Sequence, residues 1–224
     1  MSTSVIVPAA GSGTRLGENT PKAFVDLAGR TILARTVDAV QSSDRIDLDR
    51  IVVVVPDELT ERTRAELSGS ACPIDVIVGG AERTDSVRAG LARATGEYVL
   101  VHDAARPFTP AAVFERVVGA LRAGHRAVVP GLPVVDTLKR VDGDRRVLQT
   151  VDRSVLRAIQ TPQGFHADAL AQAYAATDDV ATDDAGLAER AGIDVHVVDG
   201  DPDAFKITTP WDLRLARAIA KGWD

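Results

Sequence analysis

The chain has 224 residues, 45% of them hydrophobic, and a formal net charge of −6 from 26 Lys and Arg against 32 Asp and Glu. As a single domain, a chain of this length buries roughly 70% of its unfolded surface. The acidic balance, with no basic run longer than two residues, argues against a nucleic-acid partner, so local cations must hold any anionic substrate. One cysteine, no basic leader and no apolar stretch long enough to span a bilayer favour a cytoplasmic protein without a membrane partner.

The first 130 residues alternate short β-branched runs with amphipathic segments. The runs predict strands of a sheet that is buried on both faces, at residues 5–7, 51–55, 74–78, 98–101 and 127–129. Apolar residues at helical spacing predict helices around residues 33–40, 87–94 and 113–121. This order predicts an α/β fold with a mostly parallel, doubly wound sheet, which binds ligands at the carboxyl ends of its strands.

A glycine-rich turn follows the first predicted strand. Residues 8–17 read PAAGSGTRLG, and Pro21-Lys22 comes shortly after them. Small residues let backbone N–H groups approach an anion, and Arg15 and Lys22 add the charge needed to hold several phosphates. The glycine spacing fits neither the P-loop nor the dinucleotide-binding fingerprint. The turn therefore predicts a triphosphate site, and the alternative is an ordinary glycine turn.

A second polar cluster, GGAERTDS, occupies residues 79–86 at the end of another predicted strand. The backbone near Gly80 and the Ser86 hydroxyl could read the edge of a base, while Arg83 could pair with phosphate or with an acidic neighbour. The alternative is a glycine turn in which Thr84 or Asp85 caps a helix.

A third cluster, HDAARP, occupies residues 102–107 directly after the strand predicted at 98–101. Asp103 could face Mg²⁺ or a ribose hydroxyl, and Arg106 could face an anion. A plain ion pair between the two side chains is an equal alternative.

The pattern changes after residue 133. Alternating residues on both sides of the turn Asp142-Gly143-Asp144 predict a β-hairpin inserted at about residues 133–157. A two-stranded ribbon is marginally stable alone, so it should pack on its own sheet or on a second subunit. No repeat or linker separates a second domain, and residues 1–224 are predicted to form one domain.

Together these motifs resemble the 2-C-methyl-D-erythritol 4-phosphate cytidylyltransferase family of the non-mevalonate isoprenoid pathway. The markers span nearly the whole chain: PAAGxGxR at 8–15, Pro21-Lys22, GGxxRxxS at 79–86, HDAARP at 102–107, Asp136-Thr137, Val151-Asp152-Arg153, Thr161-Pro162-Gln163, Thr182-Asp183 and Lys206-Ile207-Thr208. The resemblance implies a Rossmann-like nucleotidyltransferase fold whose hairpin arm embraces a second subunit in a homodimer. It implies transfer from CTP to the sugar-alcohol phosphate with release of pyrophosphate.

The resemblance also implies roles for single residues. The nucleotide site would comprise Ala9, Ala10, Gly11, Gly13, Gly80, Arg83, Ser86 and Asp103. The sugar-phosphate site would comprise Asp103, Arg106, Thr161, Thr182 and Lys206, with Thr137 and Arg153 reaching the partner's site. Arg15, Lys22 and Lys206 would be catalytic. One departure is Ala204, where the family usually has an asparagine two residues before the lysine, which leaves the local support of Lys206 open.

The predicted chemistry depends on cations. A phosphate monoester is already largely a dianion at pH 7 and needs no general base, so Lys22, Lys206 and Arg15 would stabilise the charge that develops as pyrophosphate leaves. Mg²⁺ is the expected cofactor, carried mainly by the CTP phosphates with Asp103 nearby.

Other polar residues are interpreted as structural. The four histidines, His102, His125, His166 and His196, lack metal-ligand spacing. The pair Asp183-Asp184 after Thr182 is typical of a helix start with Thr182 as N-cap rather than of a two-metal site. Residues 210–220 predict a last helix.

Three alternatives stay open at this point. A ribitol-5-phosphate cytidylyltransferase would keep the nucleotide loop and differ in the polyol pocket. A non-catalytic nucleotide-binding regulator would have no chemical need for Lys22 and Lys206 together. A glycosyltransferase would use an Asp-x-Asp metal motif after a strand, and Asp142-Gly143-Asp144 has that spacing within the predicted turn.

Overall fold

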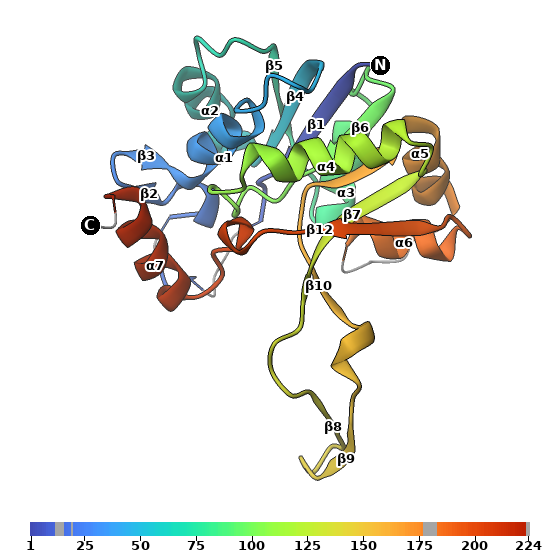
Figure 1. Cartoon of the computed structure of the whole chain (residues 1–224). Coiled ribbons are helices and arrows are strands. Elements are labelled where there is room, and N and C mark those ends of the chain that lie inside the picture. Colours follow the sequence, from blue (N-terminus) through green and yellow to red (C-terminus); the bar gives the residue numbers. More distant parts are fainter. Residues whose placement is uncertain (12–15, 19, 177–182, 223–224) are drawn as a thin grey trace.

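The computed structural model describes residues 1–11, 16–18, 20–176 and 183–222, and its centre is an eight-stranded sheet (Figure 1). The strands run in the order β10-β7-β11-β6-β1-β4-β5, and β12 pairs with β7. Their bounds are β1 Thr3–Pro8, β4 Leu48–Val55, β5 Ile74–Val78, β6 Tyr98–Val101, β7 Ala127–Pro133, β10 Arg157–Ile159, β11 Gln163–His166 and β12 Val195–Asp199. All five strands expected from the sequence are confirmed.

The sheet is parallel in its central part and mixed at one side. β1 lies between β4 and β6 and is parallel to both, and β4 is parallel to β5. β11 inserts antiparallel between β6 and β7, while β12 runs parallel to β7. The predicted doubly wound, mostly parallel sheet is therefore confirmed, with β10 and β11 as added antiparallel strands.

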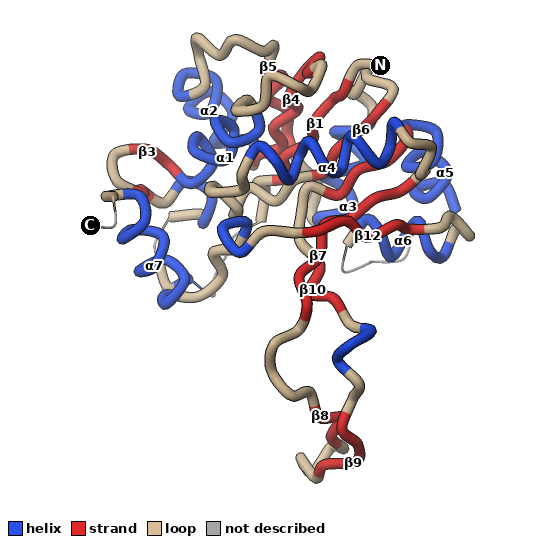
Figure 2. Tube along the Cα trace, viewed as in Figure 1, coloured by secondary structure: helices blue, strands red, loops and turns tan. Residues whose placement is uncertain are grey.

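Helices cover both faces of this sheet. Their bounds are α1 Ile32–Val40, α2 Thr60–Glu66, α3 Arg83–Leu91, α4 Ala111–Arg122, α5 Ala167–Ala176, α6 Asp184–Arg190 and α7 Pro210–Ala220. Figure 2 shows α4 in front of the strands and α3 behind them. Within the described ranges, no helix is long and apolar enough to cross a membrane.

Successive side chains of β1 point to opposite faces of the sheet and pack into a separate hydrophobic core on each face. Val5 and Val7 belong to the cluster that contains the apolar sides of α1 and α4, whereas Ile6 belongs to the cluster with α3, α5 and α6. All three side chains are at most 1% exposed. Burying a side chain of this size stabilises the fold by about 1.5–3 kcal/mol, so β1 is anchored from both sides and holds the loop that follows it.

The observed helix caps differ from two of the expected ones. The N-cap of α3 is Glu82 rather than Thr84 or Asp85, because Asp85 lies one turn inside and its carboxylate accepts from the Glu82 N–H at 3.2 Å. The N-cap of α6 is Asp183 rather than Thr182, and Asp183 Oδ1 accepts from Gly186 N at 3.0 Å. A carboxylate is as good an N-cap as a hydroxyl, so the acidic residue nearest the first turn can take the position. The last predicted helix, 210–220, matches α7.

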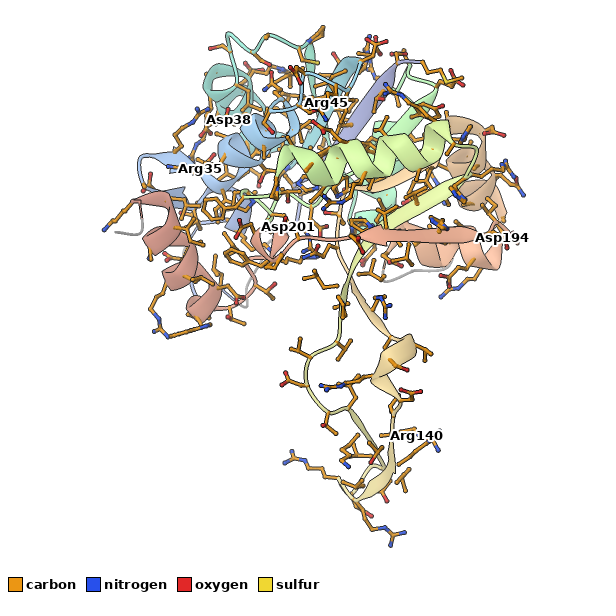
Figure 3. All side chains as sticks on the ribbon, in the orientation of Figure 1. Arg35, Asp38, Arg45, Arg140, Asp194 and Asp201 are labelled. Atoms are coloured by element: carbon orange, nitrogen blue, oxygen red, sulfur yellow. The ribbon has the colours of Figure 1, made fainter. Side chains whose placement is uncertain are left out.

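The chain leaves the body after β7 and returns through β10, forming a long arm (Figure 1). At its far end β8, Lys139–Val141, pairs antiparallel with β9, Val147–Thr150, which confirms the predicted hairpin. The strands are shorter than the alternating residues indicated. Side chains of the arm, Arg140 among them, stand out from the ribbon in Figure 3.

One further strand pair and a third apolar cluster complete the fold. β2, Asp26–Leu27, and β3, Arg30–Thr31, form a two-stranded sheet before α1. A third apolar cluster joins this region to the last helix through Leu27, Ile32, Ile207 and Leu213. The segment that carries Lys206 is therefore anchored directly beside the region that follows the glycine-rich turn.

Candidate active site

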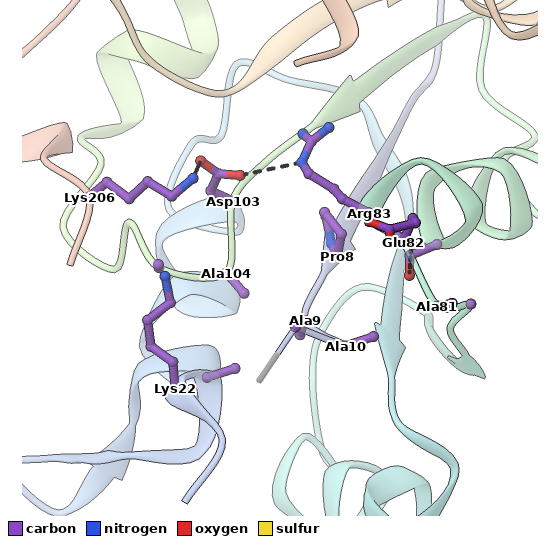
Figure 4. Close-up of a pocket in the computed structure, with 15 residues that line it drawn as sticks. Pro8, Ala9, Ala10, Lys22, Ala81, Glu82, Arg83, Asp103, Ala104 and Lys206 are labelled. Carbon is purple, nitrogen blue, oxygen red and sulfur yellow. Dashed lines mark hydrogen bonds and ion pairs between the residues drawn. The ribbon is translucent and has the colours of Figure 1, made fainter. Parts of the chain in front are cut away.

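A pocket of about 240 Å³ opens at the carboxyl ends of the central strands. Its wall combines the segment after β1, the start of α3 that follows β5, and the segment after β6, with two lysines facing them (Figure 4). These are the three clusters that the sequence predicted to meet. They meet because β1, β5 and β6, the strands that these segments follow, all run in the same direction: β1 is parallel to β6 and to β4, and β4 is parallel to β5.

Close backbone approach shapes one wall of this pocket. A Cβ atom added at Gly79 would lie 2.6 Å from the Ala10 Cβ and 2.8 Å from the Ser86 Oγ. A Cβ atom at Gly80 would lie 2.3 Å from the Asp85 Cβ. Glycine is thus required at both positions so that α3 can begin against the end of β1. Ser86 is buried, and its hydroxyl donates to the Glu82 carbonyl at 3.3 Å.

Asp103 is the centre of an ionic cluster. Its Oδ2 lies 2.9 Å from Lys206 Nζ, and its Oδ1 lies 3.9 Å from Arg83 Nε (Figure 4). Its Oδ2 also lies 3.4 Å from Arg106 Nε. Burial alone would raise the pKa of this carboxyl group, but the charges of Lys206, Arg83 and Arg106 outweigh it and hold the pKa well below its usual range. Asp103 is therefore ionised at neutral pH.

A second pocket, of about 220 Å³, shares part of its wall with the first. Arg83, Asp103 and Lys206 line both pockets. The other residues around the second pocket are Arg106, Ile159, Gln160, Thr161, Gln163 and Asp183. Two compounds bound in these pockets would therefore meet at the Asp103–Lys206 pair.

The side chain of Arg106 is held by the backbone of the segment that leads to Lys206. Its Nη1 donates to the Ala204 carbonyl at 2.5 Å, and the adjoining Ile207 N–H donates to Ala105 O at 2.9 Å. Ala204 itself is fully buried. The support of this segment comes from backbone groups, so the alanine in place of the family's usual asparagine leaves Lys206 anchored.

His102 lies behind the pocket rather than in it. Its ring is fully buried, packs at 5.0 Å from the Phe114 ring, and places Nδ1 3.1 Å from Thr161 Oγ1. Burial lowers the pKa of His102 to about 3, so the imidazole is neutral. The Thr161 hydroxyl also accepts from Asp103 N at 3.0 Å. The histidine and the threonine together orient the backbone at Asp103.

Asp212 links the last helix to Lys22. Its Oδ2 accepts from the N–H groups of Thr208 and Thr209 at 2.9 and 2.7 Å. Burial would raise the pKa of Asp212, but these hydrogen bonds and the nearby charge of Lys22 lower it. The same carboxylate thus takes part in the capping box of α7 and is stabilised by the charge of one of the two lysines of the pocket.

Most of the residues predicted for the site are brought together. Those that line one or both pockets are Ala9, Ala10, Gly11, Lys22, Gly80, Arg83, Ser86, Asp103, Arg106, Thr161 and Lys206. Gly13, Arg15 and Thr182 lie outside the described residues. Thr137 and Arg153 are exposed on the arm and line neither pocket.

Several residues of the site escaped sequence reasoning. Glu82 lines the first pocket, and Gln160 and Gln163 line the second. Gln163 is part of the motif Thr161-Pro162-Gln163, which could have indicated its place in the site.

In the part of the chain that the structure describes, no group of three or more His, Cys, Asp or Glu side chains could hold a metal ion. Asp142-Gly143-Asp144 lies at the tip of the arm, where Asp142 Oδ1 accepts from two backbone N–H groups of the turn.

A doubly wound sheet with a cationic pocket at its strand ends is the architecture of a nucleotide-binding α/β enzyme. The family model described as 2-C-methyl-D-erythritol 4-phosphate cytidylyltransferase matches residues 3–222. The chain belongs to this family.

Curated relatives with that same description cover nearly the whole chain. The protein of Rhodococcus opacus (strain B4) is 59% identical over 217 residues, which are 96% of this chain and 94% of the relative. The protein of Saccharopolyspora erythraea is 51% identical over 224 residues, covering 98% and 99% of the two chains.

Solved structures agree with this assignment. The cytidylyltransferase of Thermus thermophilus is similar with a TM-score of 0.79 and 37% identity, over 99% of this chain and 100% of that one. The 4-diphosphocytidyl-2C-methyl-D-erythritol synthase of Anaerococcus prevotii is similar with a TM-score of 0.84 and 31% identity, over 98% of both chains. The Rossmann-like fold expected from the resemblance is confirmed.

Proposed function

We propose that the chain transfers the cytidylyl group of CTP to 2-C-methyl-D-erythritol 4-phosphate, giving 4-diphosphocytidyl-2-C-methyl-D-erythritol and pyrophosphate, a step of isoprenoid precursor biosynthesis. Family membership supports this activity. The observation that carries it is the pair of pockets that share Arg83, Asp103 and Lys206. A transfer between two substrates needs their reacting atoms held against each other at one shared boundary.

The reaction needs positive charge more than it needs a base. An oxygen of the acceptor phosphate attacks the α-phosphorus of CTP, a new P–O bond forms, and the bond to pyrophosphate breaks. The acceptor is already largely a dianion, and the neutral imidazole of His102 lies outside both pockets. Lys22 and Lys206, with Arg15, would stabilise the negative charge that develops on the transferred and leaving phosphates.

Mg²⁺ fits this site as an ion that arrives with the nucleotide. The ionised Asp103 offers the hard oxygen ligand that Mg²⁺ prefers, and Mg²⁺ is commonly held by one or two carboxylates plus substrate phosphates. Three cations already surround this carboxylate, so it should attract Mg²⁺ weakly by itself. When bound, the ion would neutralise part of the triphosphate charge. Calorimetry should therefore detect stronger Mg²⁺ binding to the protein–CTP complex than to free CTP, and only weak binding to the protein alone.

We also propose that the arm packs on a second copy of the chain. Val135 and Val155 are 78% and 77% exposed, which is unfavourable for apolar side chains on a ribbon that stands away from the body. Thr137 and Arg153 would then complete the acceptor pocket of the partner.

A mixing experiment tests this sharing of the site. Arg153→Ala and Lys206→Ala each leave every homodimer with two defective sites. Randomly mixed subunits give half heterodimers, each with one intact site, so about a quarter of wild-type activity should return. No recovery after verified subunit exchange would contradict a site shared between subunits.

The choice of acceptor is tested by pyrophosphate release with CTP and Mg²⁺. Release only with 2-C-methyl-D-erythritol 4-phosphate is the expected result. Preference for ribitol 5-phosphate would instead support the related polyol enzyme, and CTP binding without release would support a regulator. The glycosyltransferase alternative has lost its support, because its Asp-x-Asp candidate lies in the turn of the arm. A cytoplasmic location stays a prediction.

A further inference from the structure

A buried carboxylate lies outside the pockets, behind Arg83. Asp184 is fully buried at the first residue of α6. Its Oδ2 accepts from Arg83 Nη2 at 2.7 Å, and its Oδ1 accepts from the Tyr174 hydroxyl of α5 at 2.5 Å. A buried carboxylate needs such partners, since its desolvation is otherwise very costly.

Arg83 stands between this carboxylate and the ionic cluster of the site. It is the first residue of α3 and lines both pockets, and its Nε faces Asp103 Oδ1 at 3.9 Å (Figure 4). The guanidinium is a rigid planar fork, so fixing Nη2 on Asp184 also fixes the direction of Nε. Burial would lower the pKa of Arg83, but Asp184 and Asp103 raise it well above its usual range. The arginine is a permanent charge at the boundary of the two pockets.

One feature of Arg83 indicates that its position is not set by stability alone. Its Nη1 is buried and has no hydrogen-bond partner among the described residues. An unmet buried donor costs about 1–3 kcal/mol. The pairing of Nη2 with Asp184 keeps the guanidinium in this unfavourable place, and such departures from local stability are typical of functional sites.

The start of α6 does not need Arg83 for its own placement. Asp183 Oδ2 accepts from Gln163 Nε2 at 2.8 Å, and Ala185 N donates to Gln163 Oε1 at 2.9 Å. Leu187 of the same helix is buried in the core. Removing the charge of Asp184 should therefore displace the Arg83 side chain more than it shifts α6.

We propose that Asp184 and Tyr174 are positioning residues of the transfer reaction, which hold Arg83 so that it keeps Asp103 directed toward Lys206 at the shared boundary. This inference rests on the proposed function. Neither residue lines either of these two pockets. They act through a chain of contacts that runs from Tyr174 to Asp184, Arg83, Asp103 and Lys206.

The test separates positioning from general loosening of α3. Asp184→Asn and Tyr174→Phe are compared with wild type for kcat, for the KM of the acceptor, and for the Kd of CTP by calorimetry. A hydrogen bond to a charged group is worth enough to lower kcat by about 10–100-fold in Asp184→Asn and about tenfold in Tyr174→Phe. The Kd of CTP should rise by a smaller factor than kcat falls, because Arg83 is only one of the residues that line the nucleotide pocket and the segment at Gly80 and Ser86 is untouched. A rise of the CTP Kd in both variants as large as the fall in kcat would overturn the proposal, since it would mean that α3 had shifted as a whole.

A double-mutant cycle tests the route through Arg83. In an Arg83→Gln background, Asp184→Asn should lower kcat/KM by less than about twofold further. Fully additive losses would contradict the route. Ala188→Gly is the matched control, because it lowers the stability of the same helix by about 1 kcal/mol without touching Arg83. Equal loss of activity in this control would overturn the proposal.

The outcome for wild type separates this proposal from the proposed function. If wild-type protein binds CTP but releases no pyrophosphate with the acceptor, the proposed function fails and the positioning role fails with it. If wild type turns over and both variants retain its kcat, only the positioning role fails.

Discussion

Replacing Lys206 by methionine should separate the catalytic role of this residue from its role in stability. Methionine keeps most of the aliphatic stem and removes the ammonium group that lies 2.9 Å from Asp103 Oδ2. The side chain of Lys206 is 41% exposed, and partly solvated ion pairs contribute less than about 1 kcal/mol. Asp103 also keeps Arg106 and Arg83 at 3.4 and 3.9 Å, so its carboxylate is not left without a counter-charge.

Activity should respond far more strongly. Lys206 stands where both pockets meet, and losing one donor that stabilises transition-state charge lowers turnover by about a hundredfold or more. The assay is initial-rate pyrophosphate release at saturating CTP and acceptor, with urea unfolding of the same preparations. A kcat within threefold of wild type would refute the catalytic role. Destabilisation above about 3 kcal/mol would refute the view that the two guanidinium groups suffice to hold Asp103.

Three further outcomes follow from the geometry. Gly79→Ala places a methyl group 2.6 Å from the Ala10 Cβ. Overpacking of this kind should destabilise the fold by about 1–3 kcal/mol and raise the Kd of CTP. An unchanged melting temperature and an unchanged CTP Kd by calorimetry would argue against the close approach. The folded-state pKa of Asp103 lies below its usual value of 3.8, so its ion pairs stabilise the protein above that pH and this stability is lost as the pH falls below it. Lys206→Met, which raises that pKa, should therefore unfold at a higher pH than wild type in an acid titration followed by circular dichroism, and identical midpoints would contradict the assignment. Val155→Asp should weaken the proposed dimer in sedimentation velocity while leaving the monomer folded, and an unaltered dimer would mean that the arm packs elsewhere.

The central sheet could be predicted because its strands carry an unambiguous signal. Residues 51–55 are β-branched without interruption and are all fully buried, as expected for a strand covered on both faces. β12 escaped prediction because it lies at the edge of the sheet, where Val197 is exposed and the apolar run is shorter. β11 contains Gly164, whose missing side chain leaves room for Val117 and Leu100 but weakens the local strand pattern.

The candidate site likewise contains residues that could be placed from the sequence and contacts that could not. Residues directly after a strand could be placed from sequence, because parallel strands bring their carboxyl ends to one edge. The pairing of Arg83 with Asp184 joins positions 101 residues apart, and no local pattern indicates it. Helix starts were misplaced by one to three residues where several capping residues follow one another, as in Thr182-Asp183-Asp184.

The shared wall between the two pockets has a consequence for inhibitor design. A single molecule with a nucleotide-like part in the pocket of Gly80 and an anionic part in the pocket of Thr161 would lose the entropy of association only once, and its second half would bind at a high effective concentration. Its linker would have to cross Asp103 and Lys206. A purely hydrocarbon linker would desolvate both charged groups without offering them a hydrogen bond. A linker with a donor and an acceptor could hydrogen-bond the Asp103 carboxylate and the Lys206 ammonium group.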